Sequence, residues 1–133
     1  MTAFLTGGAA FIGFHLSSRL LELGTAVVGF DNVNPYYDPA LKRARIEQLE
    51  AAAARTGSIF QLIEADLEDL LAVEIGFASD KPSKVVNLAA QEGVSYSIEN
   101  PAVYIRANLV GFGHILEGCR HDGWHRTLGL CLQ

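Results

Sequence analysis

The sequence has 133 residues, of which half are hydrophobic and 19% are charged, and its formal net charge is -5. A chain of this length buries roughly two-thirds of its unfolded surface, so a single domain with a real core is expected. The acidic balance argues against nucleic acid as a partner. No apolar run is long enough to span a bilayer, and the N-terminus lacks a basic lead-in, so we expect no membrane partner and a cytoplasmic protein.

The cysteines and histidines indicate neither a disulfide framework nor a metal site. Cys119 and Cys131 form no C-x-x-C pair, and no histidine stands at metal-ligand spacing from them. We interpret both cysteines as free thiols. The four histidines, expected to be surface or cap residues, are His15, His114, His121 and His125.

Short apolar runs alternate with segments of helical period, which is typical of a parallel sheet with crossover helices. Pro39 favours the start of a helix, Gly24 and Gly57 favour helix ends, and Asn100 is a candidate N-cap. The expected strands are 3–6, 26–30, 59–64, 84–88 and 127–132, and the expected helices are 11–23, 39–55, 67–77 and 101–120.

No internal repeat or low-complexity linker marks a domain boundary, so we expect residues 1–133 to form one domain. Right-handed crossovers between parallel strands then favour an α/β Rossmann-type doubly wound sheet of order 3-2-1-4-5. In such a sheet we expect the ligand crevice at the carboxyl ends of the first and fourth strands.

The first expected strand leads into FLTGGAAFIGFHL, residues 4–16. A strand that feeds a helix through a Gly-rich turn aims the helix N–H groups and dipole at one point, where a pyrophosphate is stabilised. In the frame G-x-x-G-x-x-G the outer positions are Gly7 and Gly13, but the middle one is Ala10. A positive φ at Ala10 would cost about 1–2 kcal/mol, whereas a negative φ would leave its methyl group against the phosphate. A Gly-rich turn without a ligand is the alternative.

Acidic residues follow the second and third expected strands. Asp31 is placed to accept hydrogen bonds from both hydroxyls of an adenosine ribose and to repel the 2′-phosphate of NADP, which favours NAD. Asp66 could accept from the adenine amino group while Leu67 covers the ring, although Asp66 equally suits a helix cap. The segment KVVNLAAQ, residues 84–91, ends in small residues that would let a cofactor approach the backbone; ordinary sheet core is the alternative.

Five segments together resemble the extended short-chain dehydrogenase/reductase family of NAD-dependent epimerases and dehydratases. They are FLTGGAAFIGFHLSSRLLELG, VVGFDNVNPYYDPALKRARIEQL, EADL, VVNLAAQEGVSYSIENP and ANLVGFGHILEGCR. DNVNPYYDPALK with AAQEGVSYSIENP is similar to the UDP-glucuronate 4-epimerase branch. The resemblance covers about residues 1–121 and implies the NAD-binding portion of a nucleotide-sugar epimerase, in which NAD oxidises the C4 hydroxyl of the sugar and returns the hydride to the other face.

The resemblance also implies which residues contact NAD. The amides of Phe11 and Ile12 would meet the pyrophosphate, Asp31 would hold the ribose, and Asn108 would lie near the reaction centre. Asp66 and Leu67 would frame the adenine, and residues 88–91 would line the nicotinamide side. The full implied set of cofactor-binding residues is Gly7, Ala10, Phe11, Ile12, Gly13, Asp31, Asn32, Asp66, Leu67, Leu88, Ala89, Ala90, Gln91 and Asn108.

Several family features are missing. EGVSYS places Glu92 and Ser95 where the family has an apolar residue and an arginine. The family's catalytic pair is Y-x-x-x-K, in which the lysine lowers the pKa of the tyrosine so that it can act as a base. We expect no catalytic residues and an inactive chain, truncated at its C-terminus relative to the family. The tyrosines, none followed four residues later by lysine, are Tyr36, Tyr37, Tyr96 and Tyr104.

The ending WHRTLGLCLQ departs from the Val-rich strand and serine run that the family resemblance implies. Codons for LGLCLQ shifted by one base can encode W-V-Y-A-S-S, so a frameshift or a truncated reading frame is one hypothesis. A non-catalytic dinucleotide-binding module, a folded remnant and a methyltransferase that binds S-adenosylmethionine are the alternatives.

Two helical segments carry further expectations. Full-length family members dimerise through a helix pair that includes the one matching residues 101–120, and the resemblance leaves open whether this chain forms such a homodimer. The basic stretch KRAR, residues 42–45, is interpreted as the solvated face of the second helix, although the resemblance implies substrate and interface contacts nearby.

Overall fold

The computed structural model describes residues 1–35, 38–91, 94–121 and 127–130. Helices and strands alternate along most of the chain, as the sequence pattern predicts. The elements are β1 (Thr2–Thr6), α1 (Phe11–Glu22), β2 (Ala26–Asp31), α2 (Pro39–Thr56), β3 (Phe60–Glu64), α3 (Leu70–Asp80), β4 (Lys84–Asn87), α4 (Val94–Glu99), α5 (Pro101–Tyr104), the π-helix η1 (Ile105–Val110), α6 (Gly111–His121) and β5 (Thr127–Leu130).

The strands form one parallel sheet of order β3-β2-β1-β4-β5, which confirms the predicted Rossmann-type topology. In the register, Thr6 at the end of β1 lies beside Phe30 of β2 and Asn87 of β4. Because parallel strands end at the same edge, the loops that follow β1, β2, β3 and β4 meet there.

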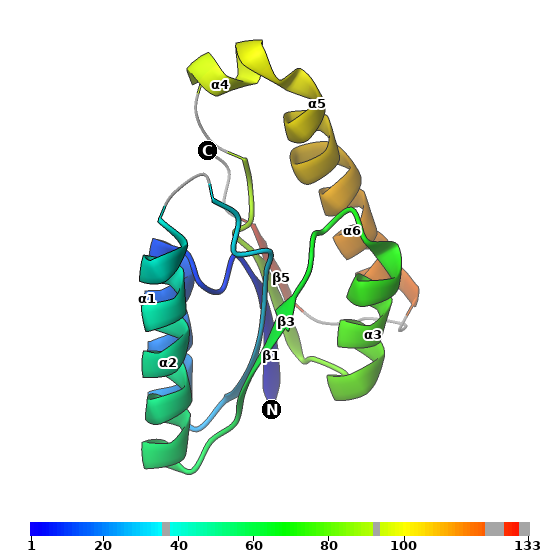
Figure 1. Cartoon of the computed structure of the whole chain (residues 1–133). Coiled ribbons are helices and arrows are strands. Elements are labelled where there is room, and N and C mark those ends of the chain that lie inside the picture. The colour runs from blue at the N-terminus through cyan, green and yellow to red at the C-terminus, as the bar shows by residue number, and fades with distance from the viewer. Residues whose placement is uncertain (36–37, 92–93, 122–126, 131–133) are drawn as a thin grey trace.

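Helices cover both faces of the sheet: α1 and α2 lie on one side, and α3 and α6 on the other (Figure 1). Successive strand residues point to opposite faces. Phe4 therefore packs in the cluster with α3 and α6, and its ring centroid lies 4.9 Å from that of Phe77. Ala3 and Leu5 pack in the cluster with α1 and α2. Burial on both faces explains why the strands read as apolar runs.

The predicted boundaries of the first two helices agree with the structure to within one residue. Gly24 and Gly57 have φ of 80° and 70°, and both lie just beyond a helix, in the left-handed conformation that glycine adopts at no steric cost. Pro39 is the first residue of α2. The carboxylate of Asp38 caps this helix by accepting from the amide of Ala40 at 2.9 Å.

The third helix begins later than expected. The sequence predicts 67–77, but α3 begins at Leu70, where the Asp69 carboxylate accepts from the Ala72 amide at 3.2 Å. Asp66 is therefore not the helix cap. Leu67, which the prediction placed in the helix, is instead buried in the core ahead of it.

The fourth expected helix, 101–120, is divided into α5, η1 and α6, and a short helix, α4, precedes it. Asn100 stands at the N-cap position, but its side chain makes no capping hydrogen bond. Helix α4 was not predicted because its six residues are too few to show a helical period. The expected strand end at 131–132 lies outside the described residues, as do Tyr36, Tyr37, Glu92, His125 and Cys131.

Among the described residues, none of the helices has the length and apolar character needed to cross a membrane.

Candidate functional site

The carboxyl ends of the strands open on a cavity of about 830 Å³, a volume within the usual range for small-molecule sites. Helices α4 and α5 lie beyond that edge of the sheet (Figure 1). The cavity brings together most of the predicted cofactor-binding residues. Those that line it are Gly7, Ala10, Phe11, Asp31, Asn32, Asp66, Leu67, Leu88, Ala89, Ala90 and Gln91, whereas Ile12, Gly13 and Asn108 do not belong to the lining.

The loop between β1 and α1 is held by its glycines. Gly7 has a φ of 69°, and its amide donates to the Phe30 carbonyl at 2.7 Å. Gly13 lies so close to this loop that a Cβ there would be 2.0 Å from the Gly7 carbonyl oxygen. A side chain at either position would displace the backbone that forms the cavity wall.

Ala10 fits the Gly-rich frame without strain. It is the N-cap of α1, with φ −77° and ψ 172°, an extended conformation open to any residue. The steric cost that a positive φ would impose is therefore absent. The methyl group stands at the cavity wall instead.

The first turn of α1 is open to an anion. Within the described part of the chain, no side chain caps α1 and no acidic residue lies in its first turn, whereas Asp38 and Asp69 cap α2 and α3. The first amides of a helix have no partner inside the helix. Together with the helix dipole, the amide of Phe11, which lines the cavity, can therefore stabilise a negatively charged group there, and the amide of Ile12 is the next one along the same turn.

Asp31 ends β2 and is buried, with a side chain only 3% exposed. Its Oδ2 accepts from the Ala9 amide at 3.1 Å, and its Oδ1 accepts from the Val33 amide at 2.8 Å. The Lys42 ammonium also donates to Oδ1, at 3.0 Å, and is itself only 12% exposed. Asp31 is thus fixed by both loops that flank the cavity and paired with a cation.

Two residues of the basic stretch 42–45 face this site, so its interpretation as a solvated face is wrong for them. Lys42 and Arg45 line the cavity, and Arg45 donates to the Ala9 carbonyl at 3.2 Å, with its guanidinium carbon 6.0 Å from the Phe11 ring centroid. Their spacing of three places them on one face of α2. Since α2 begins at the sheet edge that carries the site, this spacing was the signal in the sequence that both side chains could face the cavity.

The loops after β2 and β3 are joined across the cavity. The side-chain Nδ2 of Asn32 donates to Asp66 Oδ1 at 2.6 Å. The Leu67 carbonyl lies 2.6 Å from His114 Nδ1, and because a carbonyl oxygen can only accept, this nitrogen carries the hydrogen. His114 is therefore a half-buried tether rather than a surface residue, and it fixes Leu67 against α6.

Thr6 fixes the loop after β4, a role that was not predicted. Its buried hydroxyl donates to Asn87 Oδ1 at 2.5 Å and accepts from the amides of Leu88 and Ala89, each at 3.1 Å. These bonds use the donor and both lone pairs of the hydroxyl. The segment that lines the far end of the cavity is thereby attached to the end of β1.

Asn108 holds the same segment from the opposite side. Its Oδ1 accepts from the Gln91 amide at 2.8 Å, and its Nδ2 donates to the Gln91 carbonyl at 3.2 Å. The residue lies in η1, and π-helical turns are frequent at functional sites. Its contact in this structure is with the loop backbone.

Comparison with known proteins agrees with this geometry. Residues 4–129 match the family model described as GDP-mannose 4,6 dehydratase. The chain belongs to this family. This confirms the resemblance to NAD-dependent epimerases and dehydratases.

Curated proteins similar to this chain include UDP-glucuronate 4-epimerases. The chain is 43% identical over 120 residues to UDP-glucuronate 4-epimerase 4 of Arabidopsis thaliana, and the aligned region covers 90% of this chain and 26% of that protein. It is 44% identical over 117 residues to the probable UDP-glucuronate 4-epimerase of Rhizobium meliloti (strain 1021), and here the aligned region covers 88% of this chain and 33% of that protein.

Among solved structures, the chain resembles the UDP-glucose 4-epimerase of Thermus thermophilus, determined in complex with NAD. The TM-score is 0.73 at 33% sequence identity, over 92% of this chain and 35% of the other. The chain therefore spans about a third or less of the length of the relatives it matches.

Proposed function

We propose that this chain is a single NAD-binding domain, the cofactor-binding portion of a nucleotide-sugar epimerase of the UDP-glucuronate 4-epimerase kind. One observation carries the proposal: the uncapped first turn of α1, the buried Asp31 and the loop after β4 all border one cavity. The family membership and the solved relative with bound NAD support it. A cytoplasmic location stays a prediction.

In this proposal each part of NAD has a place in the cavity. The amides of Phe11 and Ile12 bind the pyrophosphate, Asp31 and Asn32 bind the adenosine ribose, and the adenine lies by Asp66 and Leu67. The loop of residues 88–91 receives the nicotinamide end. Bound NAD would supply a hydride acceptor; the contribution of this chain is to bind it and to fix its orientation.

Thr6 and Asn108 are positioning residues in this scheme. Each attaches the loop after β4 to a rigid element, Thr6 to β1 and Asn108 to η1. A loop that is already held from two sides has little conformational freedom left to lose when a ligand binds, which reduces the entropic cost of binding.

The proposal is tested by calorimetry of the 133-residue chain with NAD, with S-adenosylmethionine as the control ligand. Micromolar binding of NAD supports it, and heat from S-adenosylmethionine but not from NAD would favour a methyltransferase. Because the sequence contains no Y-x-x-x-K, we expect no turnover of UDP-glucuronate by this chain with NAD. NAD binding without turnover fits both an epimerase portion and a non-catalytic module, whereas turnover above background would contradict the expected inactivity.

The segment of residues 101–120 is proposed as a homodimer surface. This segment exposes large apolar side chains, among them Ile105, Leu109 and Leu116, which are 55%, 67% and 43% exposed. Exposed apolar side chains that gather along one helical segment are typical of a protein–protein interface. Sedimentation analysis of Leu109→Asp tests this, with Ile59→Asp as the matched control because Ile59 is 67% exposed on a different part of the molecule. A dimer lost only in Leu109→Asp supports the proposal, and a wild-type monomer at high concentration contradicts it.

A further inference from the structure

We propose that Lys42 sets how strongly this site discriminates between NAD and NADP, because it neutralises Asp31 at the position where the adenosine ribose would lie. The inference rests on the proposed function. The pair is the most enclosed ion pair of the described residues, with side chains 12% and 3% exposed and a distance of 3.0 Å between Lys42 Nζ and Asp31 Oδ1.

The hydrogen bonds of Asp31 leave it little capacity for a ribose. A carboxylate offers about four lone-pair directions. Oδ1 already accepts from the Val33 amide and Lys42, and Oδ2 accepts from the Ala9 amide. One acceptor direction, on Oδ2, is left. Asp31 alone therefore cannot accept from both ribose hydroxyls while Lys42 is in place.

Lys42 supplies the missing partner. An ammonium group has three donors, and the bond to Asp31 uses one of them. Lys42 also lines the cavity. The two ribose hydroxyls would thus be bound by Asp31 and Lys42 together, beside Asn32, with one hydroxyl donating to Asp31 Oδ2 and the oxygen of the other accepting from Lys42.

The same pair changes the charge that a 2′-phosphate would meet. An isolated aspartate repels the phosphate, but Asp31 and Lys42 together carry no net charge, and Arg45 adds a second cation on the same side of the cavity. Asp38, the N-cap of α2, is exposed, and the other two acids that line the cavity lie in the loop after β3: Asp66, which accepts from Asn32, and Glu68, which is paired with Arg106. Charge repulsion by Asp31 is therefore largely cancelled, and Lys42 can donate to the phosphate as readily as to a hydroxyl.

The test is the ratio of the two dissociation constants, Kd(NADP)/Kd(NAD), measured by calorimetry on the 133-residue chain and on Lys42→Met. Methionine keeps the length and apolar stem of lysine but removes the charge. We expect the ratio to rise at least about tenfold in Lys42→Met, because the phosphate then meets an uncompensated carboxylate. Both ligands are measured on one preparation, so any loss of folded protein cancels from the ratio.

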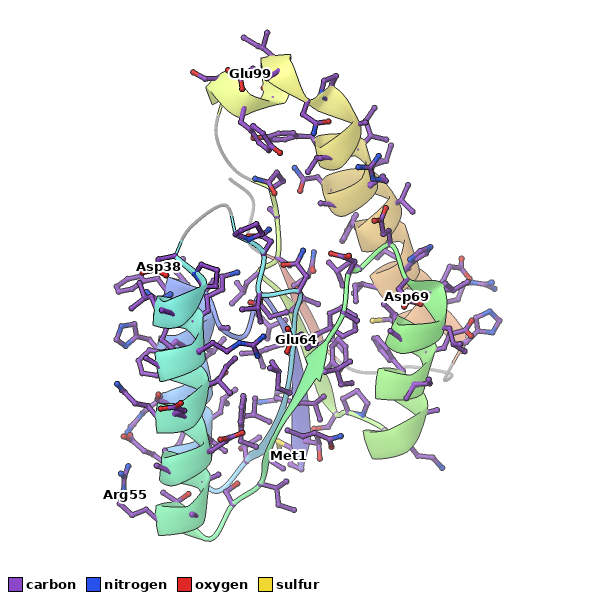
Figure 2. The ribbon with its side chains drawn as sticks, viewed as in Figure 1. Met1, Asp38, Arg55, Glu64, Asp69 and Glu99 are labelled. Atoms are coloured by element: carbon purple, nitrogen blue, oxygen red, sulfur yellow. The ribbon has the colours of Figure 1, made fainter. Side chains whose placement is uncertain are left out.

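Two further variants make the result specific. Lys42→Arg keeps the charge and should hold the ratio within about threefold of wild type. Arg55→Met removes a charge from the opposite end of α2 from Asp38 (Figure 2) and should also leave the ratio unchanged. If the ratio in Lys42→Met stays within threefold of wild type and NAD still binds, the inference about Lys42 is overturned but the proposed function is not. A wild-type chain that binds neither dinucleotide would overturn both.

Discussion

Giving α1 the cap that it lacks should stabilise the protein and weaken its binding of NAD. Ala10 has the extended conformation of an N-cap residue but no side chain that can accept from the first turn. Asp38 shows what an aspartate does in the equivalent position of α2, where it accepts from the amide two residues later at 2.9 Å. In Ala10→Asp the carboxylate would accept in the same way from the amide of Ile12, which the proposal assigns to the pyrophosphate.

The gain in folding stability and the loss of NAD affinity expected for Ala10→Asp have comparable size in free energy. A new N-cap contributes about 1 kcal/mol to stability, and a negative charge at this end of the helix adds about 0.3–1 kcal/mol. For binding, losing a hydrogen bond to a charged group costs about 1.5–3 kcal/mol, or about tenfold to hundredfold in affinity, before any charge repulsion is counted.

Ala10→Asn separates the cap from the charge, because asparagine caps about as well as aspartate but is neutral. Urea unfolding should rank the aspartate variant and the asparagine variant above wild type in stability. Calorimetry with NAD should rank them in the reverse order, with a loss of about tenfold for asparagine and a larger one for aspartate. An aspartate variant that is stabilised but binds NAD as tightly as wild type would refute the assignment of these amides to the pyrophosphate.

Three further predictions concern the scaffold. Gly13→Ala should weaken NAD binding at least tenfold and destabilise the protein by about 1–3 kcal/mol, since its Cβ would lie 2.0 Å from a backbone oxygen. Gly113→Ala is the control and should be neutral or stabilising in the same urea and calorimetry assays, because its Cβ would meet no atom within 4 Å apart from its chain neighbours and the backbone of its own helix. Thr6→Val should lower the free energy of unfolding by about 2–3 kcal/mol, because two loop amides lose their acceptor, and Thr6→Ser should restore most of it. Arg43 donates two hydrogen bonds to Glu64, at 2.8 and 2.6 Å, and lowers the pKa of that carboxyl. The stabilising effect of this pair is therefore present above the pKa that Glu64 has in the unfolded chain, and it is lost as the pH falls through the lower pKa that Glu64 has in the folded protein. The urea midpoints of wild type and Arg43→Met should thus differ at pH 7 and converge in acid.

The features that the sequence predicted well are those set by neighbours in the chain. Gly7 and Gly13 bracket a short turn, and the pattern of short apolar runs separated by helices leaves few topologies once crossovers are right-handed. Asp31 was found for the same reason, because its place at the end of a strand follows from the strand boundary. The order of the sheet followed from these local signals, and most of the predicted cofactor-binding residues do line the cavity.

The features that the sequence did not predict depend on contacts between distant segments. Lys42 was taken for a solvated residue because a helical pattern shows which residues share a face but not what that face meets. His114 bonds to a loop far away in the sequence, and the roles of Thr6 and Asn108 depend on the path of the loop after β4. The φ of Ala10 could not be read from a motif in which both signs of φ were open.

The most direct test of the account is a titration of ¹⁵N-labelled chain with NAD, followed by the backbone amide signals. The account predicts saturable shifts that are largest for Phe11 and Ile12, at the first turn of α1, with smaller ones in the loop of residues 88–91. Saturable binding that leaves the amides of Phe11 and Ile12 unmoved would contradict it.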